Sequence, residues 1–251
     1  MRYFIEVSYK GTNYSGFQVQ ANANSVQAEV EKALGIFYRE VFSCTGSSRT
    51  DAGVHALQNY FHVDTGLNLE AKHVYNINSI LPEDIVIKGF HRVGDEVHCR
   101  FDAIWREYEY FIFREKDPFL DDRAYYYPYA LDGDLMTAAA EAIKSYEDFS
   151  AFSKRNTQVK SFRCRIMESG WVFEEGCWKY SVRANRFLRG MVRGLVGTML
   201  QVGRGKLGLD EFRAVIESGD SARADFSVPG HGLFLVEVNF PKTIGLMMDR
   251  G

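Results

Sequence analysis

Strand-like and helix-like segments alternate along this chain, and this alternation constrains the fold more than any other feature of the sequence. Residues 2–9 alternate polar and apolar side chains, as a half-buried strand does, and apolar residues recur at helical spacing within residues 26–40. The second half loosely repeats this pattern, and the two halves meet near residues 104–107. We therefore expect an α+β protein of two similar layered α/β lobes, with residues 1–105 in one lobe and residues 106–251 in the other.

The bounds of single elements follow from local patterns. Asn24 and Gln27 stand three residues apart, as in a capping box, and predict the start of the helix that continues to residue 40. Further helices are expected at residues 71–79, 134–146 and 184–203 and from residue 210. Further strands are expected at residues 86–90, 97–101, 107–113, 164–173, 177–184 and 232–240.

The composition indicates an ordinary globular protein. Hydrophobic residues make up 46% and charged residues 25% of the 251 positions, which disfavours a disordered, collagenous or coiled-coil chain. The longest apolar-rich stretch, residues 188–202, contains Arg189 and Arg193 and is shorter than the roughly 20 residues that span a bilayer. The alternating N-terminus does not resemble a signal peptide. We therefore expect no membrane association and a cytoplasmic location.

Neither the cysteines nor the histidines are spaced as metal ligands. The four cysteines form no CxxC pair, and the six histidines form no HExxH pair and no dense cluster. Free cysteines are commonly buried in proteins of reducing compartments. The sequence therefore predicts no disulfide, no metal site and four buried thiols, which are Cys44, Cys99, Cys164 and Cys177.

The charge of the chain is unevenly distributed. Although the net charge is −3, residues 149–209 contain twelve Lys or Arg and only three acidic residues, a local charge of +9. Residues 176–209 contain seven basic residues and no acid, with Trp178, Tyr180 and Phe187 among them. Basic and aromatic side chains in one stretch are typical of nucleic-acid contacts. The alternative is a solvated basic face that is balanced by acidic neighbours in the fold.

A helix over residues 184–203 would place several of these basic residues on one face. At about 100° per residue, Arg186, Arg189 and Arg193 lie within about 60° of one another. The opposite face is apolar and predicts a core contact, through Leu188, Met191, Val192, Leu195 and Met199. The pattern therefore predicts one face toward the core and one toward an anion, with Arg186 and Arg189 as candidate substrate-binding residues.

Asp51 is the first candidate for a chemical role. It lies in the sequence SRTDAGVHA, residues 48–56, between Arg49 and Gly53. Small neighbours let a bulky ligand approach the backbone, and a nearby arginine keeps a carboxylate ionised, as a carboxylate nucleophile requires. On pattern alone, the alternative is an N-cap or Asx-turn residue.

Six segments, taken in order, resemble landmarks of the TruA-type tRNA pseudouridine synthases, which isomerise uridine to pseudouridine in the anticodon arm. They are YKGTNYSGFQ (residues 9–18), SRTDAGVHA (48–56), NSILPEDI (78–85), FDAIWREYEYFI (101–112), ANRFLRGMVRGLVG (184–197) and PGHGLFL (229–235). The chain departs from the family at Phe17, where Trp is common, at Ser47 and Ser48, where Ala or Gly is common, and at Arg189, where His is frequent. These departures are expected to alter RNA contacts and to leave the chemistry intact. The resemblance implies a pseudouridine synthase-like fold with largely antiparallel sheets.

The resemblance also implies roles for single residues. Asp51 is implied to be the catalytic carboxylate, Arg193 its partner, and Tyr108 the aromatic residue that stacks on the target base. Arg49 is implied to fill the space that the flipped base leaves, and Leu233 to form an apolar wall of the pocket. On pattern alone, Tyr108 and Leu233 are ordinary strand residues and Arg193 solvates a helix face.

The implied reaction breaks the N-glycosidic bond of a uridine, rotates the uracil and reattaches it through carbon, without a cofactor or a metal. The implied substrate is the anticodon arm of tRNA, at tRNA positions 38, 39 and 40, and the implied assembly is a homodimer. Two alternatives remain open: a non-catalytic protein or chaperone that binds structured RNA, and a metal-dependent nuclease. A nuclease would need clustered carboxylates, whereas the paired acids of the chain are typical of a polar turn (Asp121 and Asp122) and a helix cap (Asp132 and Asp134).

Overall fold

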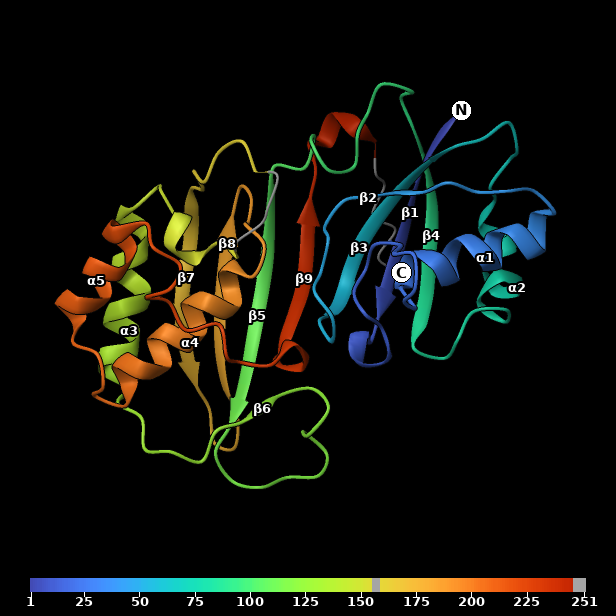
Figure 1. The fold of residues 1–251 in the computed structure, drawn as a ribbon. Helices are drawn as coiled ribbons and strands as arrows, with labels where there is room; N and C mark the ends of the chain where they lie inside the picture. Colours follow the sequence, from blue (N-terminus) through green and yellow to red (C-terminus); the bar gives the residue numbers. More distant parts are fainter. Residues whose placement is uncertain (155–158, 246–251) are drawn as a thin grey trace. The chain divides into compact units, whose positions relative to one another are not determined.

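The computed structural model describes residues 1–154 and 159–245, which form two compact units (Figure 1). The first unit comprises Met1–Ile104 and the chain from Leu235 onward, and the second comprises Trp105–Phe234. Each unit combines helices with mostly antiparallel strands, so the expected α+β class is confirmed. The similarity of the two lobes and their division as domains between residues 105 and 106 stay predictions.

The sheet of the first unit is built around the N-terminal strand. Strand β1 (Arg2–Tyr9) lies between β4 (Ile85–Val93) and β3 (His55–Asp64), and both pairs are antiparallel. The short strand β2 (Thr45–Gly46) pairs with β3, and β9 (Leu233–Asn239) follows β3 in the strand order. The observed bounds of β1 are those that the sequence predicts, and its apolar side chains are buried on the faces of the sheet.

Two helices belong to the first unit, α1 (Val26–Tyr38) and α2 (Val74–Asn78). The N-cap of α1 is Ser25 and not the predicted Asn24, because the Ser25 side chain accepts a hydrogen bond from the Ala28 backbone amide. The side chain of Gln27 is used differently from a capping residue, since its amide nitrogen donates to the Cys44 carbonyl at 2.8 Å. The cap therefore lies one residue later than the sequence pattern indicates.

The second unit is organised around three antiparallel strands in the order β5 (Trp105–Phe113), β8 (Trp178–Ala184) and β7 (Ile166–Phe173). The short strand β6 (Tyr125–Tyr126) pairs with β5 in parallel. Several of the buried side chains on these strands are large and aromatic, as in the fully buried cross-strand pair of Tyr110 and Tyr180. Aromatic pairs of this kind stabilise adjacent strands.

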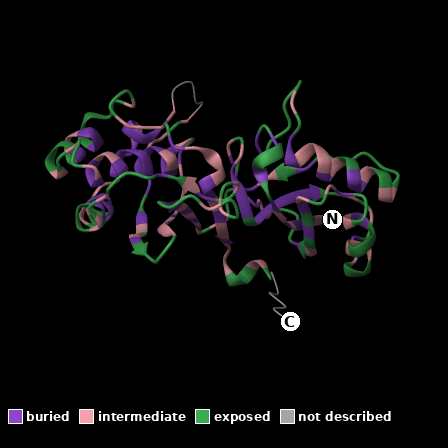
Figure 2. Ribbon diagram, turned by 90° about the horizontal axis from the view of Figure 1, so that it is seen from below, coloured by how far each residue is buried: buried purple, intermediate pink, exposed green. Residues whose placement is uncertain are grey.

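Helices α3 (Gly133–Ala142), α4 (Met191–Gly203) and α5 (Leu209–Ser218) complete the second unit. Asp132 caps α3 by accepting from the Leu135 amide, as its sequence position predicts. Four residues of the predicted apolar stripe, Met191, Val192, Leu195 and Met199, lie on α4 and are at most 4% exposed, whereas the fifth, Leu188, is buried but precedes the helix. In both units the buried residues lie on the strands and the inner faces of the helices, and the loops are largely exposed (Figure 2).

Short 3₁₀ helices connect several of these elements within the described chain. They span Gly11–Asn13, Ala71–His73, Ile143–Ser145, Ser150–Phe152, Gly230–Gly232 and Lys242–Ile244.

Three of the four cysteines are buried as expected, whereas Cys177 is half-buried. No helix within residues 1–154 and 159–245 is long and apolar enough to cross a bilayer.

Two predicted elements are wrong. The helix expected from residue 184 begins only at Met191, because Ala184 still pairs with Arg106 at the end of the β8 ladder. Gly190, with φ of 76°, then turns the chain into the helix, a backbone conformation that favours glycine. The strand expected at residues 97–101 is a turn, since the Asp102 carboxylate accepts from the His98 amide at 2.7 Å and satisfies it locally.

Candidate functional site

Asp51 begins a tight turn that leads into β3. The Val54 amide donates to the Asp51 carbonyl at 3.2 Å, and Gly53 supplies the φ of 77° that this turn requires. The Asp51 residue is half-buried, and a strand follows the turn. Asp51 is therefore not the N-cap of a helix, which removes one of the two structural explanations for an aspartate at this position.

The residues that precede Asp51 are fixed by buried hydrogen bonds. The hydroxyl groups of Tyr9 and Thr50 are 2.8 Å apart. The Asn59 side-chain amide donates both to the Ser48 carbonyl at 2.9 Å and to the Tyr9 hydroxyl at 3.1 Å. Because these polar groups are buried, each depends on the others for its hydrogen bonds, and the backbone that carries Asp51 is held from two strands.

The N-terminal loop packs directly against the Asp51 turn. The Phe17 amide donates to the Thr50 carbonyl at 3.1 Å. Gly16 has φ of 117°, and a Cβ atom built on it would lie 3.1 Å from the Thr50 carbonyl oxygen. Glycine at this position therefore allows two backbone segments to approach as closely as they do. The segments of residues 9–18 and 48–56, far apart in sequence, form one substructure of the first unit.

Three of the four departures from the family pattern lie in the interior. Phe17 is 1% exposed and stacks on Phe61 with ring centroids 4.5 Å apart. Ser47 and Ser48 are also buried, and the Ser47 hydroxyl donates to the Cys99 carbonyl at 2.7 Å. Their side chains pack within the first unit, and the expectation that these positions alter RNA contacts stays a prediction.

Arg49 differs from its buried neighbours because its side chain is exposed. It lines a small pocket of about 130 Å³ together with residues of the N-terminal loop, α1 and β2. The other residues that line this pocket are Phe17, Gln18, Gln27, Cys44, Thr45 and Gly46. Arg49 and Asp51 thus belong to one rigid loop, and the guanidinium group of Arg49 lies at the surface of this loop.

Tyr108 and Leu233 belong to the second unit and are both nearly buried, at 8% and 6% exposure. Tyr108 lies on β5 opposite Val182, and its ring packs edge-to-face against Phe187 with centroids 4.9 Å apart. Leu233 is the first residue of β9 and directly follows the 3₁₀ helix Gly230–Gly232. Burial of this degree agrees with packing roles and leaves their functional roles as predictions.

Arg193 lies near the start of α4 and is anchored to the backbone of the chain that precedes β9. Its Nε donates to the Val228 carbonyl at 2.8 Å, and one of its terminal nitrogens donates to the Phe226 carbonyl at 3.4 Å. The alternative that Arg193 solvates a helix face is therefore wrong. A guanidinium that is held by two carbonyl groups has a defined orientation, which a lysine could not reproduce.

A polar network that sequence reasoning did not find positions the segment to which Arg193 is bound. The Asp225 amide donates to the Thr198 hydroxyl at 3.0 Å, and the Gln201 side chain donates to the Asp225 carboxylate at 2.7 Å. A Cβ atom on Gly197 would lie 2.2 Å from the Asp225 carbonyl oxygen, so this segment also packs closely on α4. In the sequence, the only sign of this close packing is the glycine at position 197, in the segment of residues 184–197 that resembles the family.

Arg186 and Arg189 do not share a helical face with Arg193, because both precede the first residue of α4. Arg186 is half-buried and Arg189 is exposed. The Arg189 carbonyl accepts a hydrogen bond from the Lys154 amide at 2.9 Å, which ties this connecting segment to an earlier loop. The prediction of three arginines on one helix face is wrong, since the strand β8 and its following turn occupy the first seven residues of the expected helix.

Glutamates of β5, outside the basic stretch, and Glu168, within it, pair with two of its cations. Lys179 is 2.8 Å from a Glu109 oxygen. Arg183 pairs with Glu107 at 2.7 Å and with Glu168 at 2.6 Å. For these two cations the alternative of a balanced basic face is confirmed. One of the twelve basic residues of the stretch, Arg155, lies outside the described residues.

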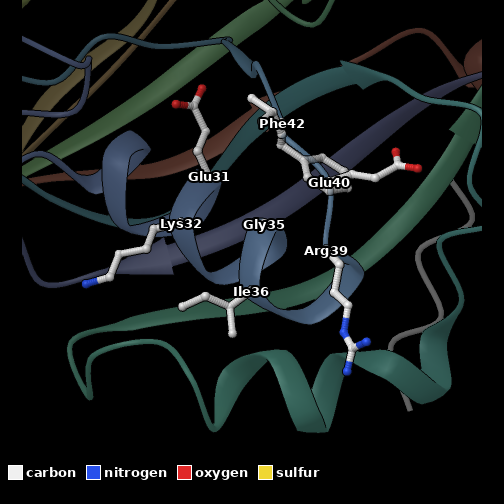
Figure 3. Close-up of a pocket in the computed structure, with 8 residues that line it drawn as sticks. Glu31, Lys32, Gly35, Ile36, Arg39, Glu40 and Phe42 are labelled. Atoms are coloured by element: carbon white, nitrogen blue, oxygen red, sulfur yellow. The ribbon is translucent and has the colours of Figure 1, made fainter.

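A hollow beside α1 is unrelated to the predicted residues. It has a volume of about 490 Å³ and lies beside the C-terminal half of α1 and the segment that follows it (Figure 3). Glu31, one of its lining residues, accepts from the Cys44 amide at 2.8 Å and so holds the chain that leads to β2. None of the site residues predicted from the sequence lines this hollow.

Comparisons with known proteins agree on one family. The family profile described as tRNA pseudouridine synthase matches residues 5–102 and 139–241 of the chain. The chain is 44% identical over 248 residues to tRNA pseudouridine synthase A of Parabacteroides distasonis, which covers 97% of each protein. It is 43% identical to the protein of the same name from Porphyromonas gingivalis, over 98% of this chain and 99% of that protein. The Staphylococcus aureus protein of that name is 35% identical over 95% of this chain and 91% of its own length.

Proposed function

Because this chain belongs to the tRNA pseudouridine synthase family, we propose that Asp51 is the carboxylate on which its isomerisation of uridine to pseudouridine in tRNA depends. Membership of this family makes the chain an isomerase, so the alternatives of a non-catalytic RNA-binding protein and of a nuclease are set aside. The observation that supports Asp51 is its position on a turn whose flanking residues are fixed by buried hydrogen bonds. Such fixation keeps a reacting group in place at little entropic cost.

In the proposed mechanism, Asp51 acts on the ribose of an extruded uridine. Either it attacks the sugar as the N-glycosidic bond breaks, or it assists formation of a glycal-like intermediate. The detached uracil then rotates and rejoins the same sugar through C5, which loses its proton while N1 takes one up, and in the first route the bond between Asp51 and the sugar breaks. Both routes require an ionised carboxylate and a pocket that retains the uracil, since an escaped base would end the reaction.

The remaining site residues are proposed for the roles that the resemblance implies. Arg49, exposed on the same loop as Asp51, fills the gap in the stacked RNA after the target base has left it, which offsets part of an unstacking cost of a few kcal/mol. Tyr108 stacks on the flipped uracil, and Leu233 forms an apolar wall of its pocket. Arg193 is the cationic partner of the carboxylate.

The substrate and the oligomeric state are likewise proposed from the resemblance. The target uridines lie in the anticodon arm, at tRNA positions 38, 39 and 40, and the enzyme acts as a homodimer in the cytoplasm. Arg186 and Arg189, which flank Phe187 in the segment between β8 and α4, contact the phosphate backbone of the tRNA.

The test is the nearly isosteric substitution Asp51→Asn, assayed on unmodified tRNA by chemical mapping of pseudouridine. We expect the variant to bind tRNA and to form no pseudouridine, while the wild-type enzyme at a small fraction of the tRNA concentration converts all of its target uridines. Asp95→Asn, which changes an exposed aspartate of the same unit, serves as the matched control and should retain activity. Pseudouridine formation by the Asp51→Asn variant would overturn the assignment.

A further inference from the structure

Two histidines and a cysteine meet in the first unit, outside the residues assigned to the reaction. His62 lies on β3, and His98 and Cys99 lie in the turn that follows β4. One ring nitrogen of each histidine and the Cys99 sulfur all lie within 4.8 Å of one another. His62 Nδ1 is 3.2 Å from the sulfur, and the two imidazole rings pack with their centroids 4.5 Å apart. The spacing of these residues in the sequence gave no sign of this cluster.

The three side chains differ in their access to solvent. Cys99 is fully buried and His62 is 6% exposed, whereas His98 is half-buried. An ion would therefore reach the cluster from the side of His98 and find two further ligands in the interior.

The surroundings of the cluster compensate the charge of a nearby arginine, Arg2. The Arg2 guanidinium forms two hydrogen bonds to the Asp64 carboxylate, at 2.8 and 2.6 Å, and a third to the Val97 carbonyl at 3.0 Å. This paired arginine repels a cation less than an isolated one would. The turn itself is held by the hydrogen bond from the His98 amide to the Asp102 carboxylate.

We propose that His62, His98 and Cys99 bind a zinc ion. Two imidazole nitrogens and one thiolate are ligands that zinc prefers, and three protein ligands leave a fourth tetrahedral position for water. On binding, the Cys99 thiol loses its proton to the solvent and the thiolate sulfur bonds to the metal. The thiol now donates to the Thr45 carbonyl at 3.1 Å, and this hydrogen bond would be replaced by the metal–sulfur bond.

The proposed site is adjacent to the loop that carries Asp51. The Cys99 carbonyl accepts from the Ser47 hydroxyl at 2.7 Å, and Thr45 lies opposite His62 in the β2–β3 pair. An ion that joins β3 to the turn at Cys99 would therefore stabilise the start of this loop. Because the ion binds the folded chain, the midpoint of thermal unfolding should rise with zinc concentration.

The experiment titrates the full-length protein, freed of metal by dialysis against a chelator, with zinc and separately with cobalt(II). We expect one equivalent of either metal to bind, with a thiolate-to-cobalt charge-transfer band and a higher unfolding temperature. His98→Gln and Cys99→Ala should each weaken binding by at least about tenfold, and Cys99→Ala should abolish the charge-transfer band. His73→Gln and Cys44→Ala, which change a half-buried histidine and a buried cysteine of the same unit outside the cluster, should bind as the wild type does.

His98→Gln keeps the test decisive if Cys99→Ala fails to fold, since His98 is only half-buried and its loss leaves the interior intact. Absence of a charge-transfer band in the wild-type protein would overturn the proposal. So would equal loss of cobalt binding in the His98→Gln and His73→Gln variants. Neither result would affect the assignment of Asp51, because the zinc titration does not measure turnover.

Discussion

The hydroxyl oxygen of Tyr9 lies 2.8 Å from Thr50 Oγ1 in the interior of the first unit. Thr50 directly precedes Asp51 in the chain. Tyr9 ends strand β1, and Thr50 belongs to the loop that carries the proposed catalytic carboxylate. The Tyr9 hydroxyl also accepts from the Asn59 side chain at 3.1 Å. This single hydroxyl therefore joins two strands to the loop, and its removal tests whether the loop must be rigid.

Tyr9→Phe should lower both stability and turnover. The substitution leaves two buried polar groups, on Thr50 and Asn59, without one of their partners, at a cost of about 1–2 kcal/mol in the free energy of unfolding. Turnover should fall severalfold because the backbone before Asp51 is less firmly held. Urea unfolding and pseudouridine formation measure the two effects. Tyr3→Phe removes a hydroxyl that bonds to Asn68, at a site remote from the loop, and should change turnover little. Equal losses of turnover in the two variants would contradict the role of Tyr9.

Gly16→Ala should disturb the same loop from its other side. The added methyl group would sit 3.1 Å from the Thr50 carbonyl oxygen, on a residue whose φ of 117° alanine rarely adopts. We expect a loss of about 1–3 kcal/mol in the free energy of unfolding and a clear drop in turnover. Gly66→Ala is the matched control, since a Cβ atom there meets no atom within 4 Å. Thermal unfolding and single-turnover assays of both variants check the prediction, and wild-type behaviour of Gly16→Ala would refute it.

The sequence predicts the elements whose pattern is local and misses those that depend on distant partners. The bounds of β1 follow from side-chain alternation, and the Asp132 cap from one residue type at one position. The helix at residue 191 starts late because the ladder between β8 and β5 continues to Ala184, which no helical periodicity can indicate. Tertiary pairing here overrides a favourable helical pattern.

In the candidate site, too, the sequence indicates local features and misses contacts between residues that are far apart in the chain. The motif around Asp51 identifies the loop, whereas the hydrogen bond that joins Tyr9 to Thr50 spans 41 residues of sequence and is visible only in the fold. The anchoring of Arg193 to the Val228 carbonyl depends on a backbone oxygen, which carries no sequence signature at all. Residue types can indicate which groups take part in a reaction, but the contacts that orient them arise from the packing.

Salt dependence distinguishes an arginine that contacts phosphate from one that serves the fold. Arg189 is exposed, whereas Arg183 pairs with Glu107 and Glu168. Arg189→Gln should weaken tRNA binding and reduce the slope of log affinity against log salt by about 1, since one phosphate contact is lost. Arg183→Gln should leave that slope nearly unchanged. Filter-binding titrations at several salt concentrations measure both, and identical slopes in the two variants would remove Arg189 from the RNA contacts.

Asp225 connects the stability of the second unit to the orientation of Arg193. Burial alone would raise its pKa, but hydrogen bonds from Ser227 and from the Gln201 side chain outweigh this effect, and the pKa of the carboxyl is lowered. A carboxyl whose pKa is lower in the folded chain than in the unfolded one stabilises the fold above the unfolded value, near 3.9. That contribution is lost as the pH falls through the lower, folded value.

Asp225→Asn should therefore cost about 1 kcal/mol of unfolding free energy at pH 7, a modest value because the group is only half-buried, and less below about pH 3. Turnover at pH 7 should also fall, since the segment whose carbonyl groups hold Arg193 loses the hydrogen bonds that the charged carboxylate accepts. Urea unfolding at both pH values and pseudouridine formation at pH 7 measure these effects. Asp121→Asn, at an exposed position of the same unit, should change neither quantity. If the stability difference between wild type and Asp225→Asn grows as the pH is lowered, the carboxylate is not stabilised by its hydrogen bonds, and its proposed support of Arg193 is wrong.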